Sequence, residues 1–151
     1  MSRRGHLQLI LHGAIILLIG MLVGIPGFPS TQKYTLMDEI RLFWRQAHLI
    51  PVVTGAWMIA SGAALPHLKL TDRGESLLTW SLIVSGYAFP VSLLPWAYAL
   101  FKLHVDVMKS SFVALYMLPL IITGIGALVG DLLIIRGAYT ALRDKREPRL
   151  P

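Results

Sequence analysis

His48 is the residue best suited to carry out chemistry. It lies in a long apolar stretch, and the helical face that starts at it has little side-chain bulk. The residues 4, 7, 11 and 14 positions after it are Val52, Gly55, Ile59 and Gly62. A neutral imidazole beside such a flat apolar slot is a suitable axial ligand for haem iron. Arg41 and Arg45 precede the histidine by about two turns and one turn of helix, where they can pair with haem propionates. This face predicts a haem site. The alternative is a histidine that hydrogen-bonds a neighbouring helix, beside arginines that snorkel to the interface.

Other candidates are polar residues inside apolar stretches, where such groups are costly and usually face protein. They are His12, Thr54, Tyr87, Ser92, Tyr116 and Asp131. From their places in the expected helices, we predict roughly 20 Å of depth between His12 and His48, so that they do not share a metal within one chain. Depth favours His67 as the neighbour of His12 and His104 as the neighbour of His48.

The elements that must position these residues are transmembrane helices. The chain is 55% hydrophobic and only 15% charged, and it holds four charge-free runs of about the 20 residues that a helix needs to cross a bilayer. We predict an all-α, four-transmembrane-helix bundle that forms a single integral membrane domain over residues 1–151. The expected helices cover about 7–28, 43–68, 76–101 and 110–135, and a basic tail covers 136–151. The first run follows two arginines as a signal peptide does, but its length predicts a retained helix.

Charge predicts the orientation and the surroundings of the bundle. Lys and Arg are more numerous on the side that holds both termini, which predicts cytoplasmic N and C termini in an inner (plasma) membrane. The net charge of +6 resides on residues that flank the spans, so that anionic lipid is the expected partner and nucleic acid is not. Pairs of small residues four positions apart predict tight helix packing or self-association. They are Gly20 and Gly24, Ala56 and Ala60, and Gly126 and Gly130.

Several chemistries are excluded by residue type. The chain has no cysteine, which rules out disulfides, thiolate zinc sites, iron–sulfur clusters and cysteine nucleophiles. It has no phosphate-binding loop, no His-x-x-x-His pair and no Ser/His/Asp arrangement that would favour a hydrolase, a kinase or a zinc enzyme. A cofactor must be held through His, Met, Tyr or carboxylate groups.

Residues 44–55 read WRQAHLIPVVTG and resemble the second-helix motif of styrene oxide isomerases, which has the form W-x-R-A-H-x-G-P-x-x-N-G. The likeness continues through Leu65-Pro66, the loop at residues 70–73, Leu77-Leu78 and Gly86, and the pair His12-Gly13 matches a His-Gly pair of the same family. The resemblance implies a small membrane protein that forms a homotrimer, binds haem b and isomerises an aryl epoxide to an aldehyde. The hydrophobic epoxide would enter from the bilayer and react on ferric haem acting as a Lewis acid.

By this resemblance His48 corresponds to the axial haem ligand. Thr54 stands in the place of a family asparagine and Leu93 in the place of a family tyrosine, and the resemblance assigns both groups to orienting the epoxide. We therefore expect Thr54 to act in catalysis, with Tyr87 and Ser92 as substitutes for the missing tyrosine. The resemblance adds His12 to the cofactor-binding residues.

Two other classes of function remain open. A haem protein for electron transfer, sensing or haem handling would need the same His48, with a second ligand such as His104 or one from a neighbouring subunit. A small transporter without a cofactor would use His12 and Asp131 as a proton or ion path.

Overall fold

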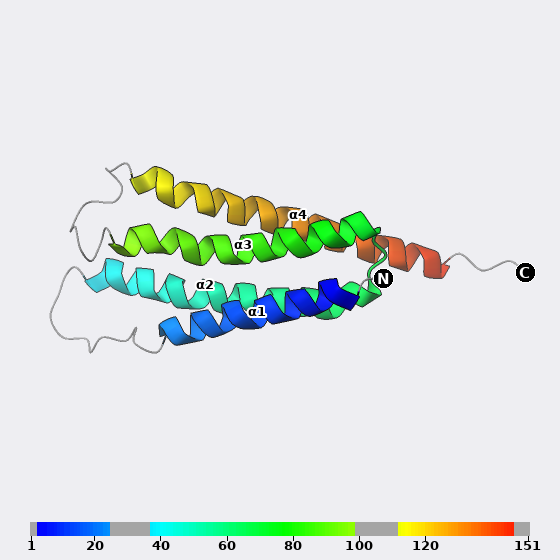
Figure 1. The fold of residues 1–151 in the computed structure, drawn as a ribbon, viewed down its shortest axis with the longest axis horizontal. Helices are drawn as coiled ribbons and strands as arrows, with labels where there is room; N and C mark the ends of the chain where they lie inside the picture. Colours follow the sequence, from blue (N-terminus) through cyan, green and yellow to red (C-terminus); the bar gives the residue numbers. More distant parts are fainter. Residues whose placement is uncertain (1–2, 25–36, 99–111, 147–151) are drawn as a thin grey trace, which may run out of the picture.

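The computed structural model describes residues 3–24, 37–98 and 112–146, which form four long α-helices (Figure 1). The elements are α1 (Arg3–Gly24), α2 (Met37–Ala64), the short 3-10 helix η2 (Leu65–His67), α3 (Asp72–Tyr98) and α4 (Phe112–Arg146). The described residues contain no strand. The predicted all-α class is confirmed.

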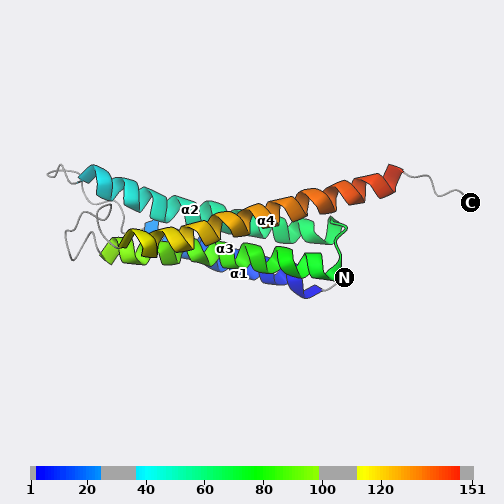
Figure 2. The same cartoon turned by 90° about the horizontal axis from the view of Figure 1, so that it is seen from above.

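The helices form two antiparallel pairs. α1 packs along α2 and α3 packs along α4, while α3 also contacts both helices of the first pair (Figures 1 and 2). α4 runs past the ends of the other helices, and its C-terminal part lies beyond them in Figure 1. Only 6% of the most apolar stretch of α4 is buried, so this helix presents most of its surface to its surroundings.

Among the described residues, three helices are long and apolar enough to cross a membrane. Their spans are Arg4–Val23 in α1, Arg45–His67 in α2 with η2, and Met117–Asp144 in α4. Large apolar side chains face outward along all of them; Leu18, Val53 and Ile125, for example, are each more than half exposed. This pattern indicates a membrane protein, because in water such a surface would drive aggregation.

The helix ends differ from those expected from charge. α1 is already helical at Arg3, four residues before the start of the charge-free run that predicts 7–28, and residues 25–28 lie outside the described residues. The expected tail at 136–151 is helical as far as Arg146. The reason is that an apolar run measures the depth of the bilayer, whereas a helix continues for as long as its backbone hydrogen bonds form.

The α1 and α2 backbones approach closely at glycines. A Cβ atom on Gly55 would lie 2.6 Å from the carbonyl oxygen of Gly13, and one on Gly13 would lie 2.8 Å from the carbonyl oxygen of Gly55. Gly20 meets Val52 and Gly62 meets the carbonyl oxygen of His6 in the same manner. No side chain fits at these points, so that glycine permits the pairing of the two helices.

A second glycine contact joins α3 to α4. A Cβ on Gly126 would lie 2.7 Å from the carbonyl oxygen of Ser81, and one on Gly130 would lie 2.5 Å from Leu82. The Ser85 hydroxyl donates a 2.7 Å hydrogen bond to the carbonyl oxygen of Thr123. The tight packing predicted for Gly126 and Gly130 is confirmed, and it occurs within the chain.

We expect Gly55→Ala to destabilise the bundle by about 1–3 kcal/mol, since the new methyl group would push two backbones apart. The matched control is Gly124→Ala, because a Cβ at Gly124 meets nothing within 4 Å. That variant should unfold at the same temperature as the parent or slightly higher, since alanine favours helix. Thermal unfolding in detergent measures both, and equal melting temperatures for the two variants would contradict the close contact.

Candidate functional site

The His48 imidazole is oriented by a backbone carbonyl on the neighbouring helix. Its Nδ1 atom lies 2.8 Å from the carbonyl oxygen of Gly20. A carbonyl oxygen only accepts hydrogen bonds, so Nδ1 is the nitrogen that carries the proton. In the neutral ring, Nε2 then keeps its lone pair free to bind a metal.

The sequence around this contact explains the close approach. Pro51 lies inside α2 and is fully buried, and its Cβ lies 3.0 Å from the place where a Gly20 side chain would begin. Proline has no N–H group, so the carbonyl of residue 47 lacks its usual helical partner at this turn. Gly20 thus contributes two things, the space for α2 and the acceptor for His48. The sequence predicts it only as a packing residue, since nothing in a sequence shows which carbonyl a histidine will meet.

The face expected to form an open haem slot is covered by α1. Val52 meets Gly20, Gly55 meets Gly13 and Leu17, and Ile59 meets Gly13. The glycines of this face therefore make room for another helix, and the expectation that they leave an empty slot is wrong for the single chain. The same spacing of residues suits a haem slot and a helix contact, because any flat apolar face of a helix accepts a ring or a second helix.

His12 and Tyr87 form a second polar contact between α1 and α3. The His12 Nδ1 atom lies 3.0 Å from the Tyr87 hydroxyl, and the two rings meet edge to face with 5.7 Å between their centres. Both groups are partly buried. The hydrogen bond holds the phenol hydroxyl at a defined place inside the bundle.

The two histidines lie at different levels of the bundle. His12 and Gly20, the partner of His48, are eight positions apart on α1, which corresponds to about 12 Å along the helix. This distance is shorter than the predicted value, because the register of α1 against α2 is set by the glycine contacts and not by the ends of the apolar runs. Gly62 faces His6, so that His67 lies past His6 along the bundle and away from His12.

Thr54 lies between the His48–Gly20 contact and the His12–Tyr87 contact, where α2 meets α3. Its methyl carbon would be 3.7 Å from a Cβ on Gly86, and Ile16 of α1 meets the same glycine. Ser92 is fully buried and donates its proton to the carbonyl oxygen of Phe89 at 2.6 Å. Tyr87 and Ser92 are the two expected substitutes for the family tyrosine. The Tyr87 hydroxyl is hydrogen-bonded to a residue of another helix, whereas the Ser92 hydroxyl is hydrogen-bonded within its own helix.

The remaining predicted haem-site residue with a described side chain is Arg45. Arg45 is exposed, in keeping with a place at the membrane interface. The side chains of Arg41, Leu93, His104 and Tyr116 lie outside the described residues.

The chain matches a known family model over most of its length. The family model described as styrene oxide isomerase matches residues 6–139, which include His12, His48 and Tyr87. The chain belongs to the styrene oxide isomerase family. The match runs from the beginning of α1 into the last third of α4, and it confirms the resemblance carried by residues 44–55. No curated protein matches the chain.

We expect Tyr87→Phe to lower the free energy of unfolding by about 1 kcal/mol, because the ring remains and only the hydrogen bond to His12 is lost. Tyr139→Phe is the matched control, since the Tyr139 side chain is 67% exposed. Chemical or thermal unfolding in detergent measures both variants. An equal effect of the two substitutions would show that the hydroxyl of Tyr87 is not engaged.

Proposed function

We propose that the protein is a membrane-embedded haem b enzyme that isomerises an aryl epoxide to an aldehyde. Membership of the styrene oxide isomerase family supports the reaction class. The single observation that carries the haem assignment is the hydrogen bond from His48 Nδ1 to the Gly20 carbonyl. It fixes the ring and leaves Nε2 as a neutral nitrogen ligand, which is the donor that haem iron takes from histidine.

The donors of this chain fit haem better than a metal held by protein groups alone. In the described ranges, no three His, Asp or Glu side chains gather at one point. A haem needs only one strong protein ligand, because the macrocycle supplies the other four donors. His48 would hold the iron, with Arg45 and Arg41 near the propionates.

The surface beside His48 is apolar and faces outward. Leu49 and Val53 of α2 are 48% and 59% exposed, and Met21 and Leu22 of α1 are each at least half exposed. Such side chains offer the flat apolar contact that a macrocycle needs. In the proposed homotrimer, a second chain would cover this surface and complete the site that α1 and α2 leave open.

When bound, haem supplies a ferric iron that acts as a Lewis acid on the epoxide oxygen. The epoxide and the aldehyde are isomers, so a hydrogen moves within the substrate and no oxidant or reductant is consumed. Thr54 would hydrogen-bond the substrate oxygen where the family has an amide. Tyr87, whose hydroxyl is held by His12, would stabilise charge that develops during the rearrangement.

The membrane arrangement is the second part of the proposal. α3 lies in the same bundle and is 27 residues long, enough to cross a bilayer, and we assign it as the fourth span. Both termini would then be cytoplasmic in an inner membrane, in agreement with the excess of Lys and Arg on that side. An aryl epoxide partitions into lipid and would reach the site from the bilayer.

A transporter without a cofactor is the second candidate function, and one observation favours it. The Asp131 Oδ1 atom is buried and has no hydrogen-bond partner among the described residues. An acid within a span is often part of an ion path. His12, the other group of that path, is bonded to Tyr87.

We expect His48→Ala to lose most of its haem after expression with an adequate haem supply. The measurement is the Soret absorbance of the detergent-purified protein together with a pyridine haemochrome assay. His67→Ala is the control, since it removes an exposed imidazole from η2, 19 positions further along the chain, and should retain haem. Unchanged haem in the His48 variant would refute the ligand assignment, and a parent protein without haem would favour the transporter.

We expect Thr54→Val to reduce the rate of styrene oxide isomerisation on the order of a hundredfold, with the haem content unchanged. The two side chains have nearly the same shape, so only the hydroxyl is removed. Thr123→Val is the control, because the Thr123 hydroxyl bonds the carbonyl oxygen of Pro119 in its own helix. Product formation by the parent and full activity in the Thr54 variant would exclude this hydroxyl from the reaction.

A further inference from the structure

A cleft of about 320 Å³ lies between α4 and the loop that joins η2 to α3, outside the site described above. The loop is held against α4 by a hydrogen bond from the backbone N–H of Lys69 to the carbonyl oxygen of Gly137, at 3.1 Å. Gly137 permits this contact, because a Cβ there would lie 3.0 Å from Leu68 and 3.1 Å from Leu70. The walls of the cleft are therefore fixed by the fold.

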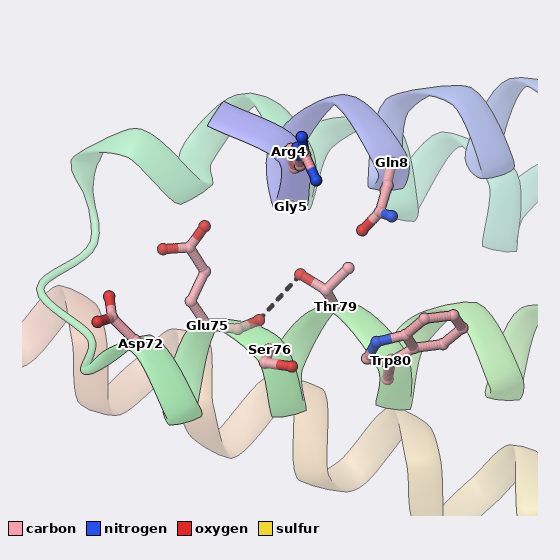
Figure 3. Close-up of a pocket in the computed structure, with 8 residues that line it drawn as sticks. All are labelled: Arg4, Gly5, Gln8, Asp72, Glu75, Ser76, Thr79 and Trp80. Atoms are coloured by element: carbon pink, nitrogen blue, oxygen red, sulfur yellow. Dashed lines mark hydrogen bonds between the residues drawn. The ribbon is translucent and has the colours of Figure 1, made fainter. Parts of the chain in front are cut away.

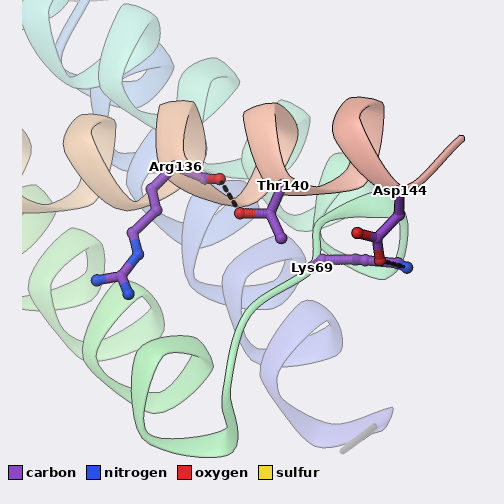
Figure 4. Close-up of polar contacts among 4 residues, drawn as sticks. All are labelled: Lys69, Arg136, Thr140 and Asp144. Atoms are coloured by element: carbon purple, nitrogen blue, oxygen red, sulfur yellow. Dashed lines mark hydrogen bonds and ion pairs between the residues drawn. The ribbon is translucent and has the colours of Figure 1, made fainter. Parts of the chain in front are cut away.

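Two polar side chains of this cleft, those of Arg136 and Thr71, can donate hydrogen bonds into it, whereas the Thr140 hydroxyl donates to the carbonyl oxygen of Arg136. The Arg136 side chain extends from α4 toward α3, whereas Lys69 extends the other way to Asp144 (Figure 4). Thr71 caps α3, since its hydroxyl oxygen accepts a 3.2 Å hydrogen bond from the N–H of Gly74, and its own proton remains available. The N-terminus of α3 adds the positive end of the helix dipole.

Acidic groups near the cleft are engaged or face elsewhere. Asp144 forms an ion pair with Lys69 (Figure 4). Asp72 and Glu75 line a different cleft of about 230 Å³ between α3 and α1, together with Arg4 and Gln8 (Figure 3). The acidic side chains of the first turn of α3 therefore line the cleft toward α1 and not the cleft that holds Arg136.

We propose that the cleft at Arg136 binds the phosphate diester of an anionic phospholipid. Arg136 would form charge-assisted hydrogen bonds with the phosphate oxygens, and Thr71 would donate one more. A lipid is favoured over free phosphate because Leu70 and Leu133 line the same cleft. The neighbouring Leu132 and Ile135 are 57% and 64% exposed on a helix apolar enough to span the membrane. Acyl chains would lie along them.

The test is a titration of the purified full-length protein with dihexanoyl phosphatidylglycerol, followed by the melting temperature. We expect a rise in melting temperature that the matching phosphatidylcholine does not produce, and an apparent affinity for phosphatidylglycerol lowered on the order of tenfold in Arg136→Gln. Arg136→Lys should retain part of the effect. Arg143→Gln is the control, because it removes the same charge from the same side of α4 two turns further on and should bind as the parent does.

Each outcome decides the proposal. Equal stabilisation by the two lipids would overturn it. So would an equal loss of apparent affinity for phosphatidylglycerol in the Arg136 and Arg143 variants. Inorganic phosphate that competes at the same concentration as the lipid would show a phosphate site and overturn the lipid assignment. Circular dichroism and size-exclusion chromatography of Arg136→Gln establish that the variant is folded, so that a loss of binding reports on the cleft.

Discussion

The crossing of α1 and α2 at Gly13 and Gly55 is the constraint on which the rest of the structure depends. Each glycine faces the backbone carbonyl of the other at a distance that excludes a side chain. This contact sets the register of the two helices and therefore places Gly20 opposite His48. In lipid, helices are not driven together by apolar burial alone, so that close backbone packing has to supply much of the attraction.

The same close packing explains how polar groups are arranged inside an apolar bundle. The buried hydroxyls of Ser85 and Ser92 donate to backbone carbonyls, and the two histidines bond a carbonyl and a phenol on other helices. A polar group in a membrane is costly unless it has such a partner. The His48 contact differs from the hydroxyl contacts in its consequence, because it satisfies one nitrogen of a ring and leaves the other for chemistry.

Apolar run lengths predicted the helical class and the approximate course of all four helices. The motif at residues 44–55 predicted the styrene oxide isomerase family, which the match over residues 6–139 confirms. The candidate site was predicted in part. His12, His48 and Tyr87 were named, but their partners were not, because a hydrogen bond between helices depends on register and rotation that no single helix encodes.

The sequence by itself determined that this chain is a helical membrane protein, because a run of about twenty apolar residues is the length that a helix needs to cross a bilayer, and it named His48 as the candidate ligand. Only the tertiary structure decided which neighbour the glycines of α2 contact. Val52, Gly55 and Ile59 form a face that suits a macrocycle or a helix equally well, and the glycines of α1 make the helix fit. The spacing of residues along one helix states which side chains share a face. What covers that face is decided by the shape of the surface opposite.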